Sequence, residues 1–381
     1  MLRVMKKVLI IYRFLPQYRV EFYNGLKKAL VEKNIELQLI YGKTSKVEAL
    51  RNDEVDIDWA QYIPNRTLKL GKIELIWQPC LKNIKGKDLI IVEGANKLIL
   101  NYILMFARHF SRFSLGIWGH GRNMQIAKNS IRNRFKYLFL NKCDCYFAYT
   151  KGVKDLLLMQ NFPENKVVIV QNAIAIGETR DYYINISDLE VKDLKNQLGI
   201  EGSNVGIFCG GMYPEKRIDF ILKVICKVRK EIPDFHMIFI GSGIDSDKVK
   251  NASENNDWIH YVGTKFGKDR VKYFKMSAIQ LMPGLVGLGV LDSFVMETPM
   301  LTTDYPYHSP EIEYLGNGIN GIITRNNLDN YTDMVIEVFK SKKYLELIDG
   351  CKESAKKYTV ENMVKNFTDG IIKCISKEYL L

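Results

Sequence analysis

Two glycine-containing loops in the second half of the chain carry charged residues of the kinds that bind a nucleotide. The first, in FCGGMYPEKR, brings Lys216 and Arg217 to the start of a helical pattern. The second, in PGLVGLGVLDSFVMETP, places Asp292 near the start of another helical pattern. Backbone N–H groups and the dipole at a helix N-terminus both favour an anion. Because cations suit phosphates and a short acid suits ribose hydroxyls, the two loops predict a site for a nucleotide diphosphate.

Alternating strand and helix patterns must position these loops. The first half shows apolar strand-like runs separated by amphipathic segments, for example a strand at 8–12, a helix at 20–33 and a strand at 36–41. The pattern restarts with a strand at 205–209 and a helix at 219–231. Strands separated by helices predict parallel, doubly wound sheets, so we expect an α/β protein of two Rossmann-like domains facing across a cleft. Ligands of such sheets bind at the carboxyl ends of the strands, where both loops fall.

Length and composition are those of an ordinary two-domain protein. The chain has 381 residues, of which 47% are hydrophobic and 26% charged, which suffices for two cores. The apolar runs near the N-terminus and at 98–107 are too short for a signal peptide or a membrane span. The seven cysteines are scattered, and only Cys143 and Cys145 are close, at a spacing wrong for zinc or redox motifs. We therefore expect all seven to be reduced in a cytoplasmic protein.

The net charge of +12 is concentrated in one region. No acid occurs between Gly94 and Cys143, where aromatic residues alternate with cations at positions 97, 108, 112, 122, 128, 132, 134, 136 and 142. A predicted helix at 126–141 is basic and amphipathic. Basic heads with apolar bodies suit the surface of an anionic membrane, whereas a solvated helical face and a nucleic-acid surface are the alternatives. The chain contains no recognised nucleic-acid module, so we expect no nucleic-acid partner.

The motifs, taken in order along the chain, resemble those of the retaining GT-B glycosyltransferases of family 4. In the second half the similar stretches are GGMYPEKRIDFIL, IGSGID, PGLVGLGVLDSFVMETPML and PEIEYLGNGINGII. In the first half they are LPQYRVEFYNGL, WGHGRNMQ, CDCYFAYTKGV and VVIVQNAI. The resemblance covers nearly the whole chain. It implies the GT-B architecture and retaining transfer of a sugar from a UDP- or GDP-sugar to a saccharide or lipid-linked saccharide, as in the biosynthesis of capsule, O-antigen or exopolysaccharide.

The resemblance also implies a domain organisation. Residues 1–178 would form the acceptor-side Rossmann-like domain, onto which a C-terminal helix at about 358–381 packs back. Residues 179–203 would form a linker, and residues 204–357 the domain that binds the nucleotide sugar. The family implies neither a metal nor a cofactor, so we expect a metal-independent hexosyl- or glycosyltransferase. Its acceptors imply a cytoplasmic protein that contacts the inner face of the plasma membrane through the basic N-terminal domain.

The donor side is expected to hold both ends of the nucleotide diphosphate. Lys216 and Arg217 would bind the pyrophosphate and stabilise its charge as the sugar leaves. Asp292 matches the second acid of the family's two-glutamate motif and would accept hydrogen bonds from the ribose. Backbone groups of the glycine loops complete the predicted donor site, at Gly210, Gly211, Gly263, Gly287, Leu288 and Gly289.

Three positions depart from the family pattern. The arginine that usually precedes Lys216 by five residues is replaced by Gly211. The first acid of the two-glutamate motif is absent, because no acid lies between Pro283 and Asp292. Glu297 stands where the family usually has glycine. The missing acid keeps open a catalytically inactive homologue that acts as a scaffold in a polysaccharide-synthesis complex, and a GT-B enzyme of another family is the other alternative.

The acceptor side is expected in the first half. His120, flanked by glycines after a strand, matches a family histidine near the reacting sugar and is our catalytic candidate with Lys216 and Arg217. Arg19, Glu93 and Arg122 are the predicted acceptor-side residues, since Arg19 starts a helix where a cation is unfavourable without an anion. No carboxylate is a clear nucleophile for double displacement. The resemblance therefore implies front-face attack, with the leaving phosphate helping to deprotonate the acceptor.

Overall fold

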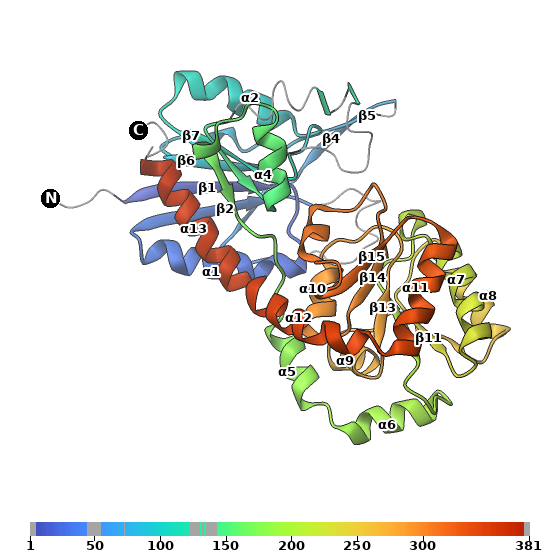
Figure 1. Cartoon of the computed structure of the whole chain (residues 1–381). Helices are drawn as coiled ribbons and strands as arrows, with labels where there is room; N and C mark the ends of the chain where they lie inside the picture. Colours follow the sequence, from blue (N-terminus) through green and yellow to red (C-terminus); the bar gives the residue numbers. More distant parts are fainter. Residues whose placement is uncertain are drawn as a thin grey trace. The chain divides into compact units, whose positions relative to one another are not determined.

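The computed structural model describes residues 5–43, 55–71, 73–121, 130–131, 133–134 and 143–376 of the chain. The chain divides into two compact units, and each is described here by itself. The first unit comprises residues 1–175 and 360–381, and the second comprises residues 176–359. Each contains a parallel sheet with helices on its faces (Figure 1), so the predicted α/β class with two Rossmann-like domains is confirmed.

The first unit is built on a seven-stranded parallel sheet. Its strands, in spatial order, are β3 (Gln61–Tyr62), β2 (Ile35–Tyr41), β1 (Lys6–Tyr12), β6 (Leu89–Glu93), β7 (Ser114–Gly119), β8 (Cys145–Ala148) and β9 (Val167–Ile169). Among its described residues, the α-helices are α1 (Val20–Val31), α2 (Ile99–Ala107), α4 (Lys151–Leu158) and α13 (Val360–Ser376). Short 3-10 helices are η1 (Gln17–Arg19), η3 (Leu81–Ile84), η4 (Arg108–Phe110) and η5 (Glu164–Lys166), and β4 (Arg66–Leu70) pairs antiparallel with β5 (Ile73–Trp77).

Helix α13 closes one face of this sheet. It packs beside α1 and against β9, although more than three hundred residues separate it from α1 in the sequence (Figure 1). Phe367 of α13 stacks on Phe147 of β8 with ring centroids 4.7 Å apart and meets Trp118 of β7 edge-on at 5.0 Å. Burial of such large rings supplies much of the free energy that keeps the C-terminal helix on this unit.

The second unit contains a six-stranded parallel sheet. Its strands, in spatial order, are β12 (Ile259–Tyr261), β11 (His236–Ile240), β10 (Val205–Cys209), β13 (Ile279–Leu281), β14 (Met300–Thr303) and β15 (Gly321–Thr324). Its helices are α5 (Gly177–Asn185), α6 (Asp188–Gln197), η6 (Pro214–Lys216), α7 (Ile218–Glu231), α8 (Ser246–Glu254), α9 (Gly267–Lys275), α10 (Gly289–Val295), η7 (Pro310–Tyr314), α11 (Leu328–Ser341) and α12 (Tyr344–Lys357).

The strand order places β10 and β13 side by side near the middle of the sheet. Their carboxyl ends lead into the two glycine loops that the sequence singled out. The segment predicted as a linker carries α5 and α6, which pack against α9. A capping box at Ser187 and Glu190 starts α6, because each side chain accepts a backbone N–H of the other. Ile186 and Ile200 from this segment join the core of the second unit.

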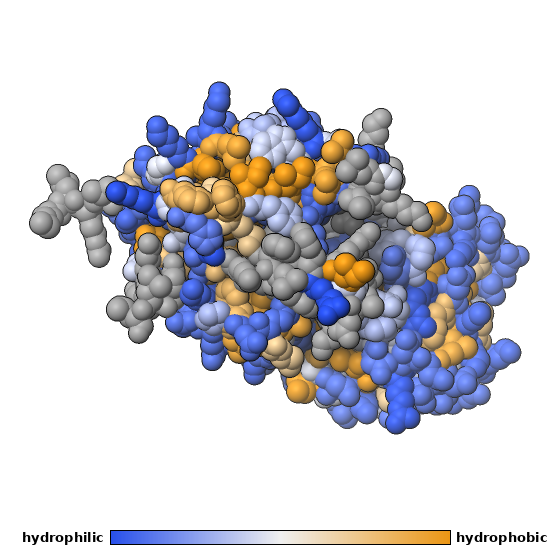
Figure 2. All heavy atoms as spheres, turned by 90° about the horizontal axis from the view of Figure 1, so that it is seen from above, coloured by the Kyte–Doolittle hydropathy of each residue, from blue (hydrophilic) through white to orange (hydrophobic). Residues whose placement is uncertain are grey.

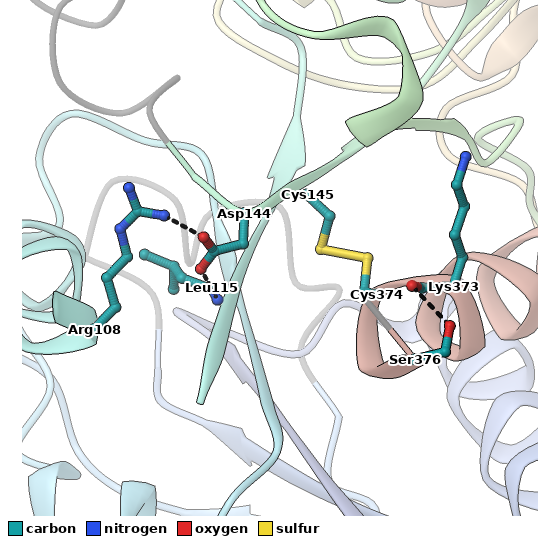
Figure 3. Close-up of a disulfide and its surroundings, with 7 residues drawn as sticks. All are labelled: Arg108, Leu115, Asp144, Cys145, Lys373, Cys374 and Ser376. Atoms are coloured by element: carbon teal, nitrogen blue, oxygen red, sulfur yellow. Dashed lines mark hydrogen bonds and ion pairs between the residues drawn. A yellow bond between two sulfur atoms is a disulfide. The ribbon is translucent and has the colours of Figure 1, made fainter. Parts of the chain in front are cut away.

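The expectation that all seven cysteines are reduced is wrong in the structure. Cys145 of β8 and Cys374 of α13 form a disulfide within the first unit (Figure 3). Their Cα atoms are 6.3 Å apart, which is within the range of disulfides. The sequence could not indicate the pair because 229 residues separate the two cysteines and only the packing of α13 on β8 brings them together.

Beside this disulfide, Asp144 fixes the start of β8. Its carboxylate accepts from Nη1 of Arg108 at 2.6 Å and from the backbone N–H of Leu115 at 2.8 Å (Figure 3). The ion pair joins η4 to the strands and accounts for one of the cations in the basic region. Most of the predicted basic helix at 126–141 lies outside the described residues. Of the helices that the structure does describe, none is long and apolar enough to cross a membrane.

We predict that the protein purified without reductant has five alkylatable thiols after denaturation, the number of cysteines outside the disulfide. Prior reduction raises the count to seven, the total in the chain, because it releases Cys145 and Cys374. Mass spectrometry of iodoacetamide-treated protein measures both counts. A Cys374→Ser variant serves as the control, with six thiols and no increase on reduction. Seven thiols in the unreduced wild-type protein would contradict the pairing.

Candidate functional site

The first glycine loop places Lys216 beside the second. After β10, the chain passes Gly210 and Gly211 and enters η6, whose last residue is Lys216. The side chain of Lys216 is only 9% exposed, and its Nζ donates to the carbonyl oxygen of Leu285 at 2.5 Å. Burial lowers the pKa of this lysine to about 8. An ammonium so poorly hydrated is available to an incoming anion at neutral pH.

The second loop approaches η6 so closely that one of its residues must be glycine. A Cβ at Gly284 would lie 2.2 Å from the carbonyl oxygen of Glu215 and 2.7 Å from the carbonyl carbon of Lys216. The N–H of Leu285 donates to the same oxygen of Glu215 at 2.8 Å. Because backbone meets backbone here, the loop has no room for a side chain at its start. The loop that packs against η6 in this way is the loop in which the first acid of the family's two-glutamate motif is missing.

Histidine 308 holds the other side of the second loop. Its Nδ1 accepts the N–H of Val286 at 3.0 Å, and its Nε2 lies 2.8 Å from the carbonyl oxygen of Thr303. An Nδ1 that accepts and an Nε2 that donates require the neutral ring. Burial lowers the pKa of His308, which is consistent with that form. The N–H of Ser309 also donates to the carbonyl of Val286 at 2.9 Å, so the loop is fixed from two sides.

Asp292 forms an ion pair that the sequence did not predict. Nη1 of Arg270, from α9, donates to Oδ2 of Asp292 in α10 at 2.9 Å. Both side chains are largely buried. The carboxylate of Asp292 raises the pKa of Arg270, and Arg270 also contacts Cys209 at the end of β10. The acid of the second loop is thus held by a cation from the helix that precedes β13.

Arg217 adopts a left-handed backbone conformation at the start of α7, with φ of 60°. Nη1 of its guanidinium donates to the carbonyl oxygen of Pro283 at 3.2 Å and to Oδ1 of Asn326 at 2.5 Å. The guanidinium also stacks 4.0 Å from the ring centroid of Phe220. Arg217 therefore braces the first loop against the second, in addition to the phosphate contact that we predict for it.

The remaining predicted donor residues lie on loops at the carboxyl ends of β10, β12 and β13. Gly210 and Gly263 have φ values of 150° and 67°, conformations that favour glycine, and a Cβ on either would meet no atom within 4 Å. Gly287 and Leu288 lead into α10, which begins at Gly289. Gly211 follows Gly210. The structure thus gathers the predicted backbone groups, Lys216 and Arg217 at one edge of the sheet.

Glu297, which replaces a usual family glycine, ends α10 with a positive φ of 52°. A left-handed residue after a helix is usually glycine because the conformation crowds a Cβ. The carboxylate of Glu297 accepts from Nη1 of Arg180 in α5 at 2.7 Å. Arg180 also donates to the carbonyl of Val295 at the end of α10. The ion pair compensates for the unfavourable backbone and ties α5 to α10.

In the first unit, His120 and Glu93 follow neighbouring strands. His120 comes directly after β7 and packs edge-on against Tyr149, with ring centroids 4.4 Å apart. Glu93 ends β6 and accepts from Nε of Arg13, after β1, with 3.0 Å to each carboxylate oxygen. The structure therefore brings a histidine and an Arg–Glu ion pair to the carboxyl edge of this sheet. Arg13 was missed in the sequence.

Arg19 has a structural environment that does not support the predicted acceptor contact. Its side chain is 1% exposed, its guanidinium lies 4.8 Å from the ring centroid of Trp118, and its Nη2 donates to Oδ1 of Asn172. The cation at the start of α1 is thus stabilised by aromatic rings and an amide within the first unit. Arg122, the third predicted acceptor-side residue, lies outside the described residues.

Within the described ranges, no group of three or more His, Cys, Asp or Glu side chains is placed to hold a metal ion. The site in the second unit is instead dominated by cations and backbone groups. Lys216, Arg217 and Arg270 all lie near the carboxyl ends of β10 and β13, and Asp292 is the acid paired among them. Such a site suits an anionic ligand, because the negative charge of the ligand pairs with these cations.

Comparison with known proteins relates the chain to glycosyltransferases. Residues 203–341 match the family model described as glycosyl transferases group 1. A glycosyltransferase of Haemophilus influenzae Rd is 21% identical over 299 residues, which cover 75% of this chain and 76% of that protein. The crystal structure of HepE from Anabaena in complex with UDP covers 96% of this chain and 100% of its own, with 12% identity and a TM-score of 0.70. The lipopolysaccharide outer core galactosyltransferase WaaB covers 96% and 99%, with 14% identity and a TM-score of 0.65.

The architecture of the chain is that of GT-B glycosyltransferases, in agreement with the predicted fold. The matched residues 203–341 carry Lys216, the two glycine loops and the Arg270–Asp292 pair. The match over this segment supports glycosyltransferase activity.

Two residues of the second unit were missed in the sequence for different reasons. Arg270 follows Gly267-Lys268-Asp269 in the first turn of α9, where a cation opposes the helix dipole unless an anion is near. That signal could have found it, because the same reasoning was applied to Arg19. His308 gave no signal, since its contacts to Val286 and Thr303 depend on how the loops pack.

We predict that Gly284→Ala destabilises the second unit and disrupts the loop. The added Cβ would contact backbone atoms at 2.2 and 2.7 Å, so the loop must move away from Lys216. The free energy of unfolding should fall by about 1–3 kcal/mol, the usual cost of overpacking, as measured by urea denaturation. Gly289→Ala is the matched control, because a Cβ there meets nothing within 4 Å. Equal stability of both variants would contradict the close approach.

Proposed function

We propose that this glycosyltransferase takes its sugar from a nucleotide-diphosphate sugar, with a UDP-sugar as the first candidate, and transfers it with retention of configuration. The observation that carries the proposal is the buried ammonium of Lys216, which faces the loop of residues 283–288 at the carboxyl ends of β10 and β13. This is the edge at which doubly wound sheets bind nucleotides. The UDP complex of the structurally similar HepE supports the choice of nucleotide.

The proposed roles follow from the chemistry of each group. Lys216 and Arg217 bind the diphosphate and stabilise the negative charge that grows on it when the glycosidic bond breaks. Loss of one such contact on a developing anion typically costs about 2–4 kcal/mol of transition-state stabilisation. Backbone N–H groups around Gly287 and Gly289 contact the phosphate or the sugar. Asp292 accepts hydrogen bonds from the ribose, and Gly210, Gly211 and Gly263 line the nucleotide.

Attack is proposed to occur on the face from which the diphosphate leaves. Fixed cations replace a metal in this proposal, and the departing phosphate takes the proton of the acceptor hydroxyl. His120 orients the sugar or the acceptor, and Glu93, held by Arg13, contacts an acceptor hydroxyl. The proposed acceptor is a saccharide or lipid-linked saccharide of an envelope polysaccharide. The structural similarity to WaaB, a lipopolysaccharide outer core galactosyltransferase, supports this class of acceptor.

We predict that UDP raises the melting temperature of the wild-type protein and that EDTA leaves the shift unchanged. A ligand at about 100 times its Kd stabilises a protein by about 2.7 kcal/mol, which a thermal melt detects. GDP, ADP and CDP are tested in parallel to identify the base. Lys216→Met should remove most of the shift. Stabilisation only in the presence of a divalent metal would contradict the metal-free site.

The pH dependence tests Lys216 directly. Because burial lowers the pKa of Lys216 to about 8, the ligand-free lysine loses its proton between pH 7 and 9, and the affinity for UDP should fall by up to about tenfold over that range. Binding in the Lys216→Met variant should be weak and nearly independent of pH. A wild-type Kd that stays constant to pH 9 would remove the ammonium from the diphosphate site.

A catalytically inactive scaffold is the second candidate, because the family's first acid is absent from the loop that packs on η6. Binding of UDP without turnover of any UDP-sugar and acceptor would favour it. Absence of nucleotide binding would contradict both the enzyme and the donor site.

We further propose that α2 and η4 contact an anionic membrane. Ile103, Phe106 and Phe110 project from this segment, and the last two are 70% and 78% exposed. The face of the molecule in Figure 2 shows hydrophobic side chains gathered beside hydrophilic ones. Exposed His109 and Arg112 adjoin them, and the sequence has no acid between Gly94 and Cys143. Exposed apolar side chains with cations close to them in the sequence suit acidic headgroups.

We predict that the protein co-sediments with phosphatidylglycerol vesicles and that Phe106→Ser combined with Phe110→Ser reduces the bound fraction at least threefold. Binding is expected to fall because both aromatic side chains are removed from the lipid interface. Ile184→Ser with Leu189→Ser, which changes two exposed apolar residues of the second unit, is the matched control and should bind as the wild type does. Equal binding to phosphatidylcholine vesicles, or an unaffected double variant, would contradict the proposed surface.

A further inference from the structure

We infer that Arg270 is a positioning residue that orients Asp292 toward the ribose of the nucleotide. The inference rests on the proposed function and adds to it a residue that the sequence motifs did not assign. Arg270 belongs to α9, outside both glycine loops. Its guanidinium donates to Oδ2 of Asp292 at 2.9 Å, and its side chain is largely buried.

The geometry leaves one oxygen of Asp292 for a ligand. Oδ2 accepts from Arg270, and Oδ1 accepts no hydrogen bond from the described residues. The side chain of Asp292 is 15% exposed, so it is neither sealed in the core nor free in solvent. A carboxylate with one oxygen held by a cation and the other open at a sheet edge can accept a hydrogen bond from a ribose hydroxyl.

The short side chain of Asp292 makes such support useful. The family motif has glutamate at this position, and aspartate is one methylene shorter, so its carboxylate stays closer to α10. Arg270 also lies near the thiol of Cys209, the last residue of β10. Arg270 therefore positions the carboxylate of Asp292 relative to β10, the strand that leads into the loop of Lys216 and Arg217. A rigid guanidinium fork gives this orientation better than a flexible ammonium does.

The opposite end of α10 carries a second ion pair that serves as a built-in comparison. Arg180 donates to Glu297 at 2.7 Å, and this pair is also partly buried. Both pairs attach α10 to a neighbouring helix, but Glu297 follows the last turn of α10, away from the glycine loop at its start. Removing Arg180 should therefore affect the stability of the unit without changing how the ribose is recognised.

The test compares the Kd of UDP with that of 2′,3′-dideoxy-UDP by isothermal titration calorimetry. The wild-type protein should bind UDP about tenfold or more tightly than the analogue, because a hydrogen bond to a charged group is lost with the hydroxyls. Arg270→Met should reduce this ratio below about threefold, and Arg270→Lys should restore part of it. Asp292→Asn should lower the ratio as well, whereas Arg180→Met should retain the wild-type ratio.

The ratio separates positioning from general structural support. A residue with only a structural role would weaken both ligands equally and leave the ratio unchanged, so an unchanged ratio in Arg270→Met overturns the inference alone. If Arg270→Met does not fold, the Arg270→Lys ratio decides, and a wild-type value contradicts orientation by the guanidinium fork. A wild-type protein that binds UDP without preferring it over the analogue contradicts the ribose role of Asp292. A wild-type protein that binds neither overturns the proposed function together with this inference.

Discussion

The contact between the ammonium of Lys216 and the carbonyl of Leu285 joins the two glycine loops of the second unit, and the candidate site depends on it. The contact exists only because Gly284 lets the second loop touch the backbone of η6. The same packing buries Lys216 and lowers its pKa, so the loop both positions the cation and strips part of its hydration. A desolvated cation costs the ligand-free protein stability. This cost is recovered when an anion binds, or progressively as the pH rises above about 8 towards the ordinary pKa of lysine.

The other residues of the site stabilise these loops from outside. The neutral ring of His308 accepts the backbone N–H of Val286, and Arg217 joins Pro283 to Asn326. The ion pair of Arg270 with Asp292 fixes the start of α10. None of these contacts requires a ligand. A site whose dipoles and charges are already oriented avoids reorganisation during the reaction, which is the physical basis of electrostatic stabilisation by an enzyme. In the first unit, a single ion pair orients a charged side chain in the same way. Arg13 holds Glu93 beside β7, the strand that His120 follows.

Several features of the chain were predictable because they depend on local sequence. Alternating apolar runs and helical patterns gave the α/β class, and glycine loops after strands pointed to the carboxyl edges where Lys216, Arg217 and the donor glycines lie. Other features were not. The sequence suggested that Arg19 meets an anionic ligand on the acceptor side, whereas Trp118 and Asn172 enclose it. It also suggested seven free thiols, whereas α13 brings Cys374 onto Cys145.

The sequence by itself determined which residue types stand at the ends of the strands, because strand and helix periodicity are properties of neighbouring residues. It also showed that Glu297 replaces a usual family glycine and that the second loop begins with Pro-Gly, but not the reason for either. Only the tertiary structure decided that Arg180 compensates the strained backbone of Glu297, that Arg270 faces Asp292, and that backbone contact excludes a side chain at Gly284. These outcomes depend on distances between segments far apart in the chain, which are set by the packing of complete helices and strands.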